Sequence, residues 1–200
     1  MPSTSLFAYQ TAELRGANLE GACVGLTTEW LVHRHHGSAS DRMAWLMPGS
    51  AGNQWASFRQ QQYETQRAVL RNDGMRTSQA DLQAHNAVLT NAGLAPSSDE
   101  RYYDFNDAHR ASRLFKRIAT DNSTYLVSLY FADGGAHVVA VSTVNGETTL
   151  FDPNYGEFKA ASSNVDKLFL GLTNSYKYPH GKHVSSVFTL HMGGGTAQST

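Results

Sequence analysis

The chain has 200 residues and a mass of 21.9 kDa, which is enough for one domain with a real hydrophobic core. Sixteen Lys and Arg against 17 Asp and Glu leave a formal net charge of −1, so no basic surface is expected to bind nucleic acid. No apolar run approaches the roughly 18 residues that a membrane span requires, and we expect no stable membrane association.

The first half of the chain is predicted to be mainly helical. Residues 1–20 are small and polar, and we expect a lead-in or loop there. From Cys23, apolar residues recur at helical spacing and end near Gly37, which predicts the first helix. Capping and turn residues predict further helices over 40–47, 53–72, 78–91 and 107–120.

The second half is predicted to form an antiparallel sheet. Asn145-Gly146 is a strong hairpin signal, and residues 162–176 are expected to form a helix over the sheet. Helices followed by strands indicate an α+β fold, with one domain over 1–192 and a flexible tail over 193–200. Strands are predicted over 124–131, 136–142, 148–151 and 184–190.

Cys23 is the only cysteine, and it lies among Gly21, Ala22 and Gly25 where the first helix is predicted to begin. Unpaired backbone N–H groups and the macrodipole at a helix N-terminus stabilise a thiolate, and small neighbours leave room for a substrate. A free cysteine is also commonly a small buried apolar residue. This stretch alone therefore leaves both interpretations open.

Two further residues are suited to assist a nucleophilic thiol. His137 lies early in an apolar strand, where an imidazole can face a cleft and act as a general base. Asp152 ends the next strand, and its carboxylate can orient the imidazole. Regular hairpin pairing places Asp152 opposite residue 139, two positions beyond His137. A bulge or a twist can close this offset, so the spacing permits contact between the two side chains. A core histidine and a turn-forming aspartate are the structural alternatives.

Three motifs, GACVGLTTEWL, GGAHVVAVS and LFDPNYGEF, occur in this order along the chain. They resemble papain-like cysteine proteases, and more closely the YopT/AvrPphB family of bacterial effector proteases. Over 40–120 the resemblance extends only to a compatible length. It implies a papain-like α+β fold, in which the nucleophile helix packs on a C-terminal antiparallel sheet. It also implies a catalytic triad of Cys23, His137 and Asp152.

Papain-like enzymes also need an oxyanion hole, formed by the backbone N–H of the nucleophile and a side-chain amide a few residues earlier. Asn18, five residues before Cys23, stands where this family carries the amide. Gln10 is another upstream amide but lies farther from the nucleophile. Asn154 is a rival to Asp152, because papain itself orients its histidine with an asparagine.

The sequence thus predicts a cysteine-type endopeptidase with a thioester intermediate, no metal and no organic cofactor. His33, His35 and His36 cluster at a helix end without other ligands at recognisable spacing. The resemblance implies a virulence effector that is secreted without a cleavable signal peptide and acts on host proteins. We also expect the protein to be a monomer. A deamidase, transglutaminase or amidase on the same scaffold, or a non-catalytic binding module, remains an alternative.

Overall fold

The computed structural model describes residues 5–193. Its helices are α1 (Cys23–His33), α2 (Ala39–Leu46), α3 (Ala51–Asn72), α4 (Thr77–Asn91), α5 (Ala108–Ile118) and α6 (Val165–Lys177), with the short 3-10 helices η1 (Leu6–Tyr9) and η2 (Ser162–Asn164). Its strands are β1 (Gln10–Glu13), β2 (Pro96–Asp104), β3 (Ser123–Phe131), β4 (Ala136–Val144), β5 (Glu147–Asp152), β6 (Gly156–Ala161) and β7 (Val184–Met192).

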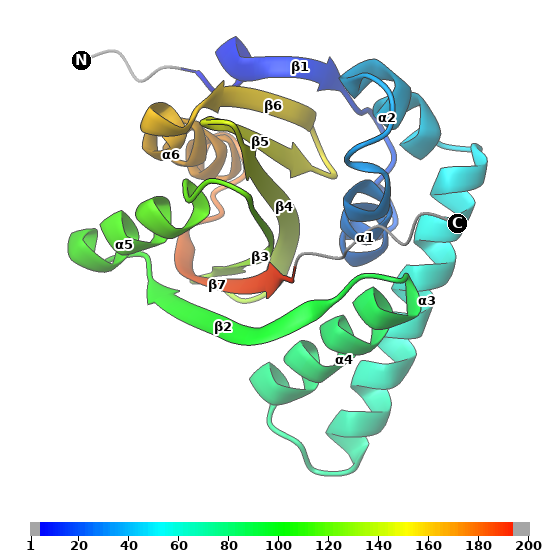
Figure 1. The fold of residues 1–200 in the computed structure, drawn as a ribbon. Helices are drawn as coiled ribbons and strands as arrows, with labels where there is room; N and C mark the ends of the chain where they lie inside the picture. Colours follow the sequence, from blue (N-terminus) through cyan, green and yellow to red (C-terminus); the bar gives the residue numbers. More distant parts are fainter. Residues whose placement is uncertain (1–4, 194–200) are drawn as a thin grey trace.

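The strands form one seven-stranded sheet in the order β1-β6-β5-β4-β3-β7-β2, and every neighbouring pair is antiparallel. Figure 1 shows α1 to α4 on one side of this sheet and α5 and α6 on the other. The predicted α+β fold, with the nucleophile helix packed on an antiparallel sheet, is therefore confirmed.

Alternating side chains of the strands supply two cores, one on each face of the sheet. In β3 and β4, Val127 and Val139 pack toward α6, whereas Leu126 and Val138 pack toward α1. Helix α1 is buried from Val24 to Leu31. A helix enclosed on all sides in this way is held in place at its N-terminus, which is where the candidate nucleophile lies.

Close contact between α1 and α3 depends on a glycine. A Cβ at Gly25 would collide with the backbone of Ala56 in α3. The helix starts are defined locally: Ser38 and Asp41 form a capping box at α2, and Ser50 caps α3. These helices begin at Ala39 and Ala51, close to the predicted starts at residues 40 and 53.

Three strands were not predicted. The lead-in expected over 1–20 contains η1 and the edge strand β1, which pairs with β6. Strand β1 has only four residues, and β6 directly follows a turn, so neither shows a long alternating pattern. Strand β2 is polar and mostly exposed because it lies at the other edge of the sheet.

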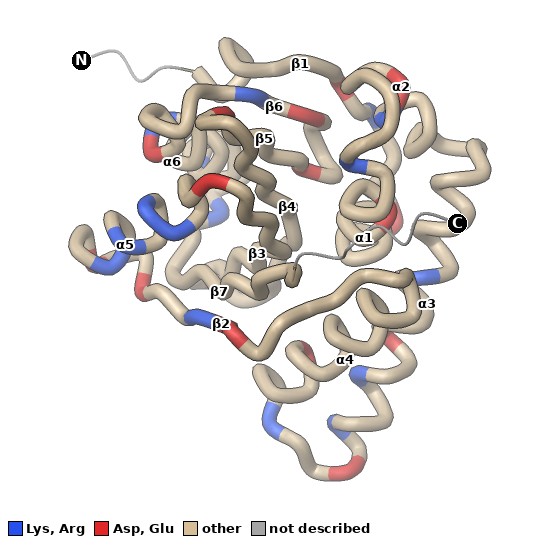
Figure 2. The backbone as a smooth tube through the Cα atoms, in the orientation of Figure 1, with Lys and Arg blue, Asp and Glu red and all other residues tan. Residues whose placement is uncertain are grey.

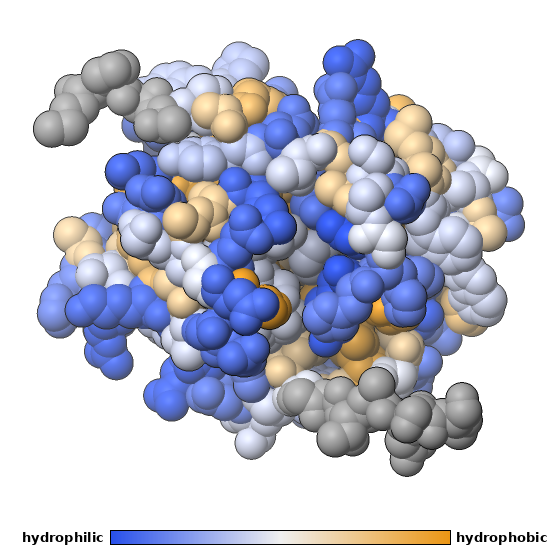
Figure 3. Space-filling model, turned by 45° about the horizontal axis from the view of Figure 1, so that its top comes forward, coloured by the Kyte–Doolittle hydropathy of each residue, from blue (hydrophilic) through white to orange (hydrophobic). Residues whose placement is uncertain are grey.

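The surface carries mixed charges. Figure 2 shows acidic and basic residues distributed over the molecule, with basic residues gathered along α5. The face drawn in Figure 3 shows apolar residues as separate patches among polar ones. Within residues 5–193, no helix is both long and apolar enough to cross a membrane. Apart from Gly193, the predicted tail lies outside the described residues.

Candidate active site

Cys23 is the first residue of α1 and is half-buried. The helix has no side-chain cap at Ala22, and α3 supplies one instead: the Gln60 Oε1 atom accepts the N–H groups of Val24, at 3.0 Å, and Gly25, at 3.2 Å. This carboxamide holds the helix start and leaves the N–H of Cys23 to another acceptor. Sequence reasoning missed Gln60, because a cap from a distant helix leaves no local pattern.

His137 and Asp152 come together at neighbouring strand ends. His137 is the second residue of β4 and Asp152 the last of β5. These strands pair without a bulge, from Val144 opposite Glu147 to Ala140 opposite Phe151.

The paired residues of these strands contain no bulge, yet the side chains of His137 and Asp152 meet. The His137 Nε2 atom lies 3.3 Å from each carboxylate oxygen of Asp152. Two side chains on one face of a sheet can reach each other diagonally, across an offset of two residues. The contact thus needs no change of register.

The electrostatics of this pair favour a charged imidazole. His137 is 5% exposed and Asp152 is fully buried. Burial disfavours the imidazolium, but the Asp152 carboxylate and the hydrogen-bonded Cys23 sulfur outweigh it and raise the pKa of His137 to about 10. Since Nε2 faces Asp152, Nδ1 is the ring nitrogen left for the thiol. The arrangement can hold a thiolate beside an imidazolium, which is the reactive pair of cysteine peptidases.

Two further groups bind the carboxylate of Asp152. The Tyr176 hydroxyl donates to Oδ2 at 2.7 Å, and the Asn154 backbone N–H donates to Oδ1 at 2.7 Å. Burial and the nearby Asp152 raise the pKa of Tyr176, so its hydroxyl keeps the proton that it donates. The Tyr176 ring also packs against His137, with 5.2 Å between ring centroids. Sequence reasoning missed Tyr176, because it comes from α6 and belongs to no motif.

The side chain of Asn154 connects this network to Asn18. Its Nδ2 atom donates to the Tyr176 hydroxyl at 2.9 Å, and its Oδ1 accepts the Asn18 amide at 2.7 Å. The side chain that contacts His137 is thus Asp152, and Asn154 holds Asp152 in place by hydrogen bonding. The Asn18 amide keeps a second N–H that its hydrogen bond to Asn154 does not use. Gln10 donates instead to the backbone carbonyl of Tyr155 at 2.8 Å.

The remainder of the FDPNYGEF motif ties the site to the helices. Phe151 stacks on Trp30 of α1, with 5.5 Å between centroids and 4° between planes. Gly156 has φ +111° and leaves room for the backbone of β1, which a Cβ would strike. Glu157, 2% exposed, accepts hydrogen bonds from Trp30 and from two nitrogens of Arg42. The motif therefore fixes β5 and β6 against α1.

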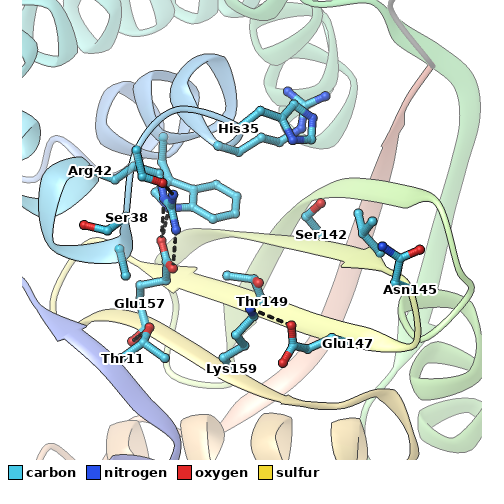
Figure 4. A pocket seen from close by; sticks show the side chains of 15 residues that line it. Thr11, His35, Ser38, Arg42, Ser142, Asn145, Glu147, Thr149, Glu157 and Lys159 are labelled. Carbon is cyan, nitrogen blue, oxygen red and sulfur yellow. Dashed lines mark hydrogen bonds and ion pairs between the residues drawn. The ribbon is translucent and has the colours of Figure 1, made fainter.

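A larger cavity lies away from Cys23, His137 and Asp152. It measures about 490 Å³ and extends over β4 to β6 beside the Asn145 turn, at the opposite end of β4 from His137. Figure 4 shows its charged walls, where Arg42 pairs with Glu157 and Lys159 with Glu147. A smaller cavity of about 240 Å³ is lined by Cys23 itself, and it is the one that belongs to the candidate site.

A metal site was not expected, and His33 has another environment. Its ring packs on Trp45 at 4.9 Å and lies 3.7 Å from Glu29. Within the described residues, no group of three or more His, Cys, Asp or Glu side chains is placed to hold a metal ion.

Helices packed on an antiparallel sheet, with a thiol at a helix start beside a His–Asp pair, define the papain-like class of cysteine peptidases. The family model "Yersinia/Haemophilus virulence surface antigen", a peptidase family, matches residues 1–192, and the chain belongs to that family. The sequence resemblance to YopT and AvrPphB proteins is thereby confirmed, and the chain is a cysteine peptidase whose substrates are proteins.

Similar proteins cover most of the chain. Proteins named as YopT-like cysteine proteases from Bradyrhizobium diazoefficiens and Sinorhizobium fredii are each 48% identical, covering 96% and 94% of this chain and 71% and 72% of their own. The cysteine protease avirulence protein AvrPphB of Pseudomonas savastanoi is 32% identical over 81% of this chain and 61% of its own. The AvrPphB crystal structure superposes with a TM-score of 0.87, at 28% identity, over 94% of this chain and 100% of that one.

Proposed function

We propose that this chain is an endopeptidase that cleaves specific protein substrates with Cys23 as nucleophile, His137 as acid and base, and Asp152 as the residue that orients His137. The observation that carries the proposal is the buried contact at 3.3 Å between His137 and Asp152, next to the half-buried thiol. A hydrogen bond between Cys23 and His137 contributes to the raised pKa of the imidazole. A site prepared for nucleophilic attack needs these features.

The proposed reaction has two steps. The Cys23 sulfur attacks the scissile carbonyl carbon, and the negative oxygen is held by the N–H of Cys23 and an N–H of Asn18. The carbon–nitrogen bond then breaks, and His137 gives a proton to the departing amine. In the second step His137 removes a proton from water, and the hydroxide attacks the thioester and releases the acid and the Cys23 sulfur. The imidazole ends in its starting state, so protons balance over the cycle.

The proposed setting is that of a secreted effector. The family model and AvrPphB carry the words virulence and avirulence in their names, which supports delivery to a host cell and a host protein as substrate. We also propose that residues 1–192 act as a single domain and as a monomer, without a cofactor.

A comparison of protein N-termini tests this function. Wild type and Cys23→Ala are incubated with eukaryotic and with bacterial cell lysate, and new N-termini are identified by mass spectrometry. We expect a small set of Cys23-dependent termini in the eukaryotic lysate. Termini only in the bacterial lysate contradict the host role. Cys23-dependent ammonia release without any new terminus contradicts proteolysis and supports a deamidase or transglutaminase.

A further inference from the structure

The cavity beside Cys23 is lined by several polar side chains. It measures about 240 Å³ and opens between the start of α1, the helices α3 and α4, and the strands β3 and β4. Because Cys23 lines it, any group bound there lies next to the reacting sulfur. The polar side chains of its walls are Gln60, Tyr63, Arg67, Asp81, His85, Ser128 and Tyr130.

Two buried polar atoms of these walls lack a hydrogen-bond partner among the described residues. They are His85 Nε2 and Ser128 Oγ, on residues only 4% and 1% exposed. A buried polar atom without a partner costs about 1 to 3 kcal/mol, so such atoms in folded proteins are completed by water or by a ligand. Because both residues line the cavity at Cys23, a substrate group that enters the cavity can form hydrogen bonds with these two atoms.

The charges in the cavity cancel. Asp81 is ion-paired with Arg67, and it also accepts the Tyr63 hydroxyl at 3.3 Å. Burial lowers the pKa of His85 to about 4, so its ring is neutral and offers one donor and one acceptor. Burial raises the pKa of Tyr130 to about 12, so its hydroxyl keeps its proton. The His85 ring stacks on Tyr63, with 4.8 Å between centroids, which fixes its direction.

Resting on the peptidase function above, we propose that this cavity is a substrate subsite for an uncharged, hydrogen-bonding side chain, and that the carboxamide of Asn or Gln is its best occupant. A carboxamide carries both a hydrogen-bond acceptor and donors, so it can form hydrogen bonds with His85 Nε2 and Ser128 Oγ at the same time. Sequence motifs did not indicate this subsite, because its polar side chains come from α3, α4 and β3.

Other side chains fit the cavity less well. Arg67 repels a cationic side chain, and Asp81 repels a carboxylate. Either charged group also loses its hydration when it enters the cavity. An apolar side chain of the same size leaves His85 Nε2 and Ser128 Oγ without partners. Sites built to hydrogen-bond a substrate group discriminate strongly against analogues that lack it.

Peptide binding to Cys23→Ala tests the subsite without requiring hydrolysis. Fluorescent peptide pools are prepared with one position fixed at a time, as the matched pairs Gln/Met and Asn/Leu, and affinities are measured by fluorescence anisotropy. We expect one position at which the amide peptide binds at least about tenfold more tightly than its apolar match. Adding Ser128→Ala is expected to reduce this ratio about fivefold, the effect of one lost hydrogen bond.

A matched control variant distinguishes the effect of losing a hydroxyl in this cavity from the effect of losing any buried serine hydroxyl. Ser142 is also a buried strand serine, but it lines the distant 490 Å³ cavity, and Ser142→Ala is expected to leave the ratio unchanged. Tyr130→Phe, which removes another hydroxyl of the subsite, gives a second measure should Ser128→Ala unfold.

Two kinds of outcome are distinguished. A preference for apolar or charged side chains at every position, binding of no pool, or a ratio unchanged by Ser128→Ala and Tyr130→Phe overturns the subsite. If the wild type fails to cleave peptides that bind with the amide preference, the subsite stands and the proposed proteolysis fails.

Discussion

Replacing Tyr176 by phenylalanine tests whether the surroundings of Asp152 support the site. The change removes one hydroxyl and keeps the ring that packs against His137. Asp152 Oδ2 loses a donor at 2.7 Å, and the Asn154 amide loses its acceptor at 2.9 Å. A buried hydrogen bond to a charged group contributes about 1.5 to 3 kcal/mol and a neutral one about 1 kcal/mol. We therefore expect the unfolding free energy to fall by about 2.5 to 4 kcal/mol.

The catalytic rate of Tyr176→Phe is also expected to fall, because Asp152 without the tyrosine hydroxyl holds the His137 imidazole less firmly. For a peptide that the wild type cleaves, kcat/KM is expected to drop about tenfold, equivalent to about 1.4 kcal/mol. Stability is measured by urea denaturation followed by tryptophan fluorescence, and kcat/KM from initial rates under conditions where the variant is fully folded.

Tyr155→Phe is the matched control. Its hydroxyl donates to the Ser175 carbonyl at the longer distance of 3.4 Å and does not contact Asp152. We expect a loss of at most about 1 kcal/mol in stability and an unchanged kcat/KM. If Tyr176→Phe behaves like Tyr155→Phe in both measurements, the hydroxyl does not position the site and the argument fails.

Three further changes test the buried charges and the helix packing. Glu157→Gln leaves the Arg42 guanidinium without a charge partner and is expected to lower the unfolding free energy by about 3 to 5 kcal/mol in urea denaturation. Gly25→Ala drives a Cβ into the backbone of α3 and is expected to cost about 3 kcal/mol by the same method. Between about pH 7 and 10 the wild type is expected to lose stability, and His137→Gln less, in urea titrations at each pH.

The sign of the pH effect follows from the raised pKa of His137, about 10 in the fold against about 6.5 in the unfolded chain. Because the native state binds this proton more tightly, protonated His137 stabilises the fold. This stabilisation is complete below about pH 6.5 and is lost as the pH rises through about 10. If the unfolding free energy of wild type and of His137→Gln changes equally with pH in this range, the raised pKa of His137 is contradicted.

Each of the other two changes has its own contrary result. Glu147→Gln, at an exposed ion pair, should cost at most about 1 kcal/mol, and an equal cost at Glu157 contradicts the burial argument. A fully stable Gly25→Ala contradicts the close contact of α1 and α3.

The sequence was most informative where a pattern was local. Apolar periodicity, caps and the Asn145-Gly146 turn located the main helices and four of the strands, and the spacing brought His137 and Asp152 to neighbouring strand ends. Strand β2 was missed because an exposed edge strand needs no apolar alternation. The paired residues of β4 and β5 contain no bulge, and the reach of the side chains along one face closes the offset between His137 and Asp152.

Residues that act from a distance left no such pattern. Gln60, Tyr176 and His85 reach the site from α3, α6 and α4, and only the tertiary packing brings them beside Cys23 or Asp152. Each is an ordinary polar or aromatic residue of an amphipathic helix by its sequence. Their contributions depend on contacts between segments distant in the sequence, which a periodicity of side chains does not specify.

The reactivity of Cys23 is the most direct test of the central claim, that His137 activates this thiol as a nucleophile. The measurement is the rate of Cys23 alkylation by iodoacetamide at pH 6, compared among wild type, His137→Gln and free cysteine. An ordinary thiol is almost fully protonated at pH 6 and reacts slowly. We expect the wild type to react at least about tenfold faster than free cysteine, and His137→Gln to lose this advantage. Equal rates for wild type and His137→Gln would contradict the account.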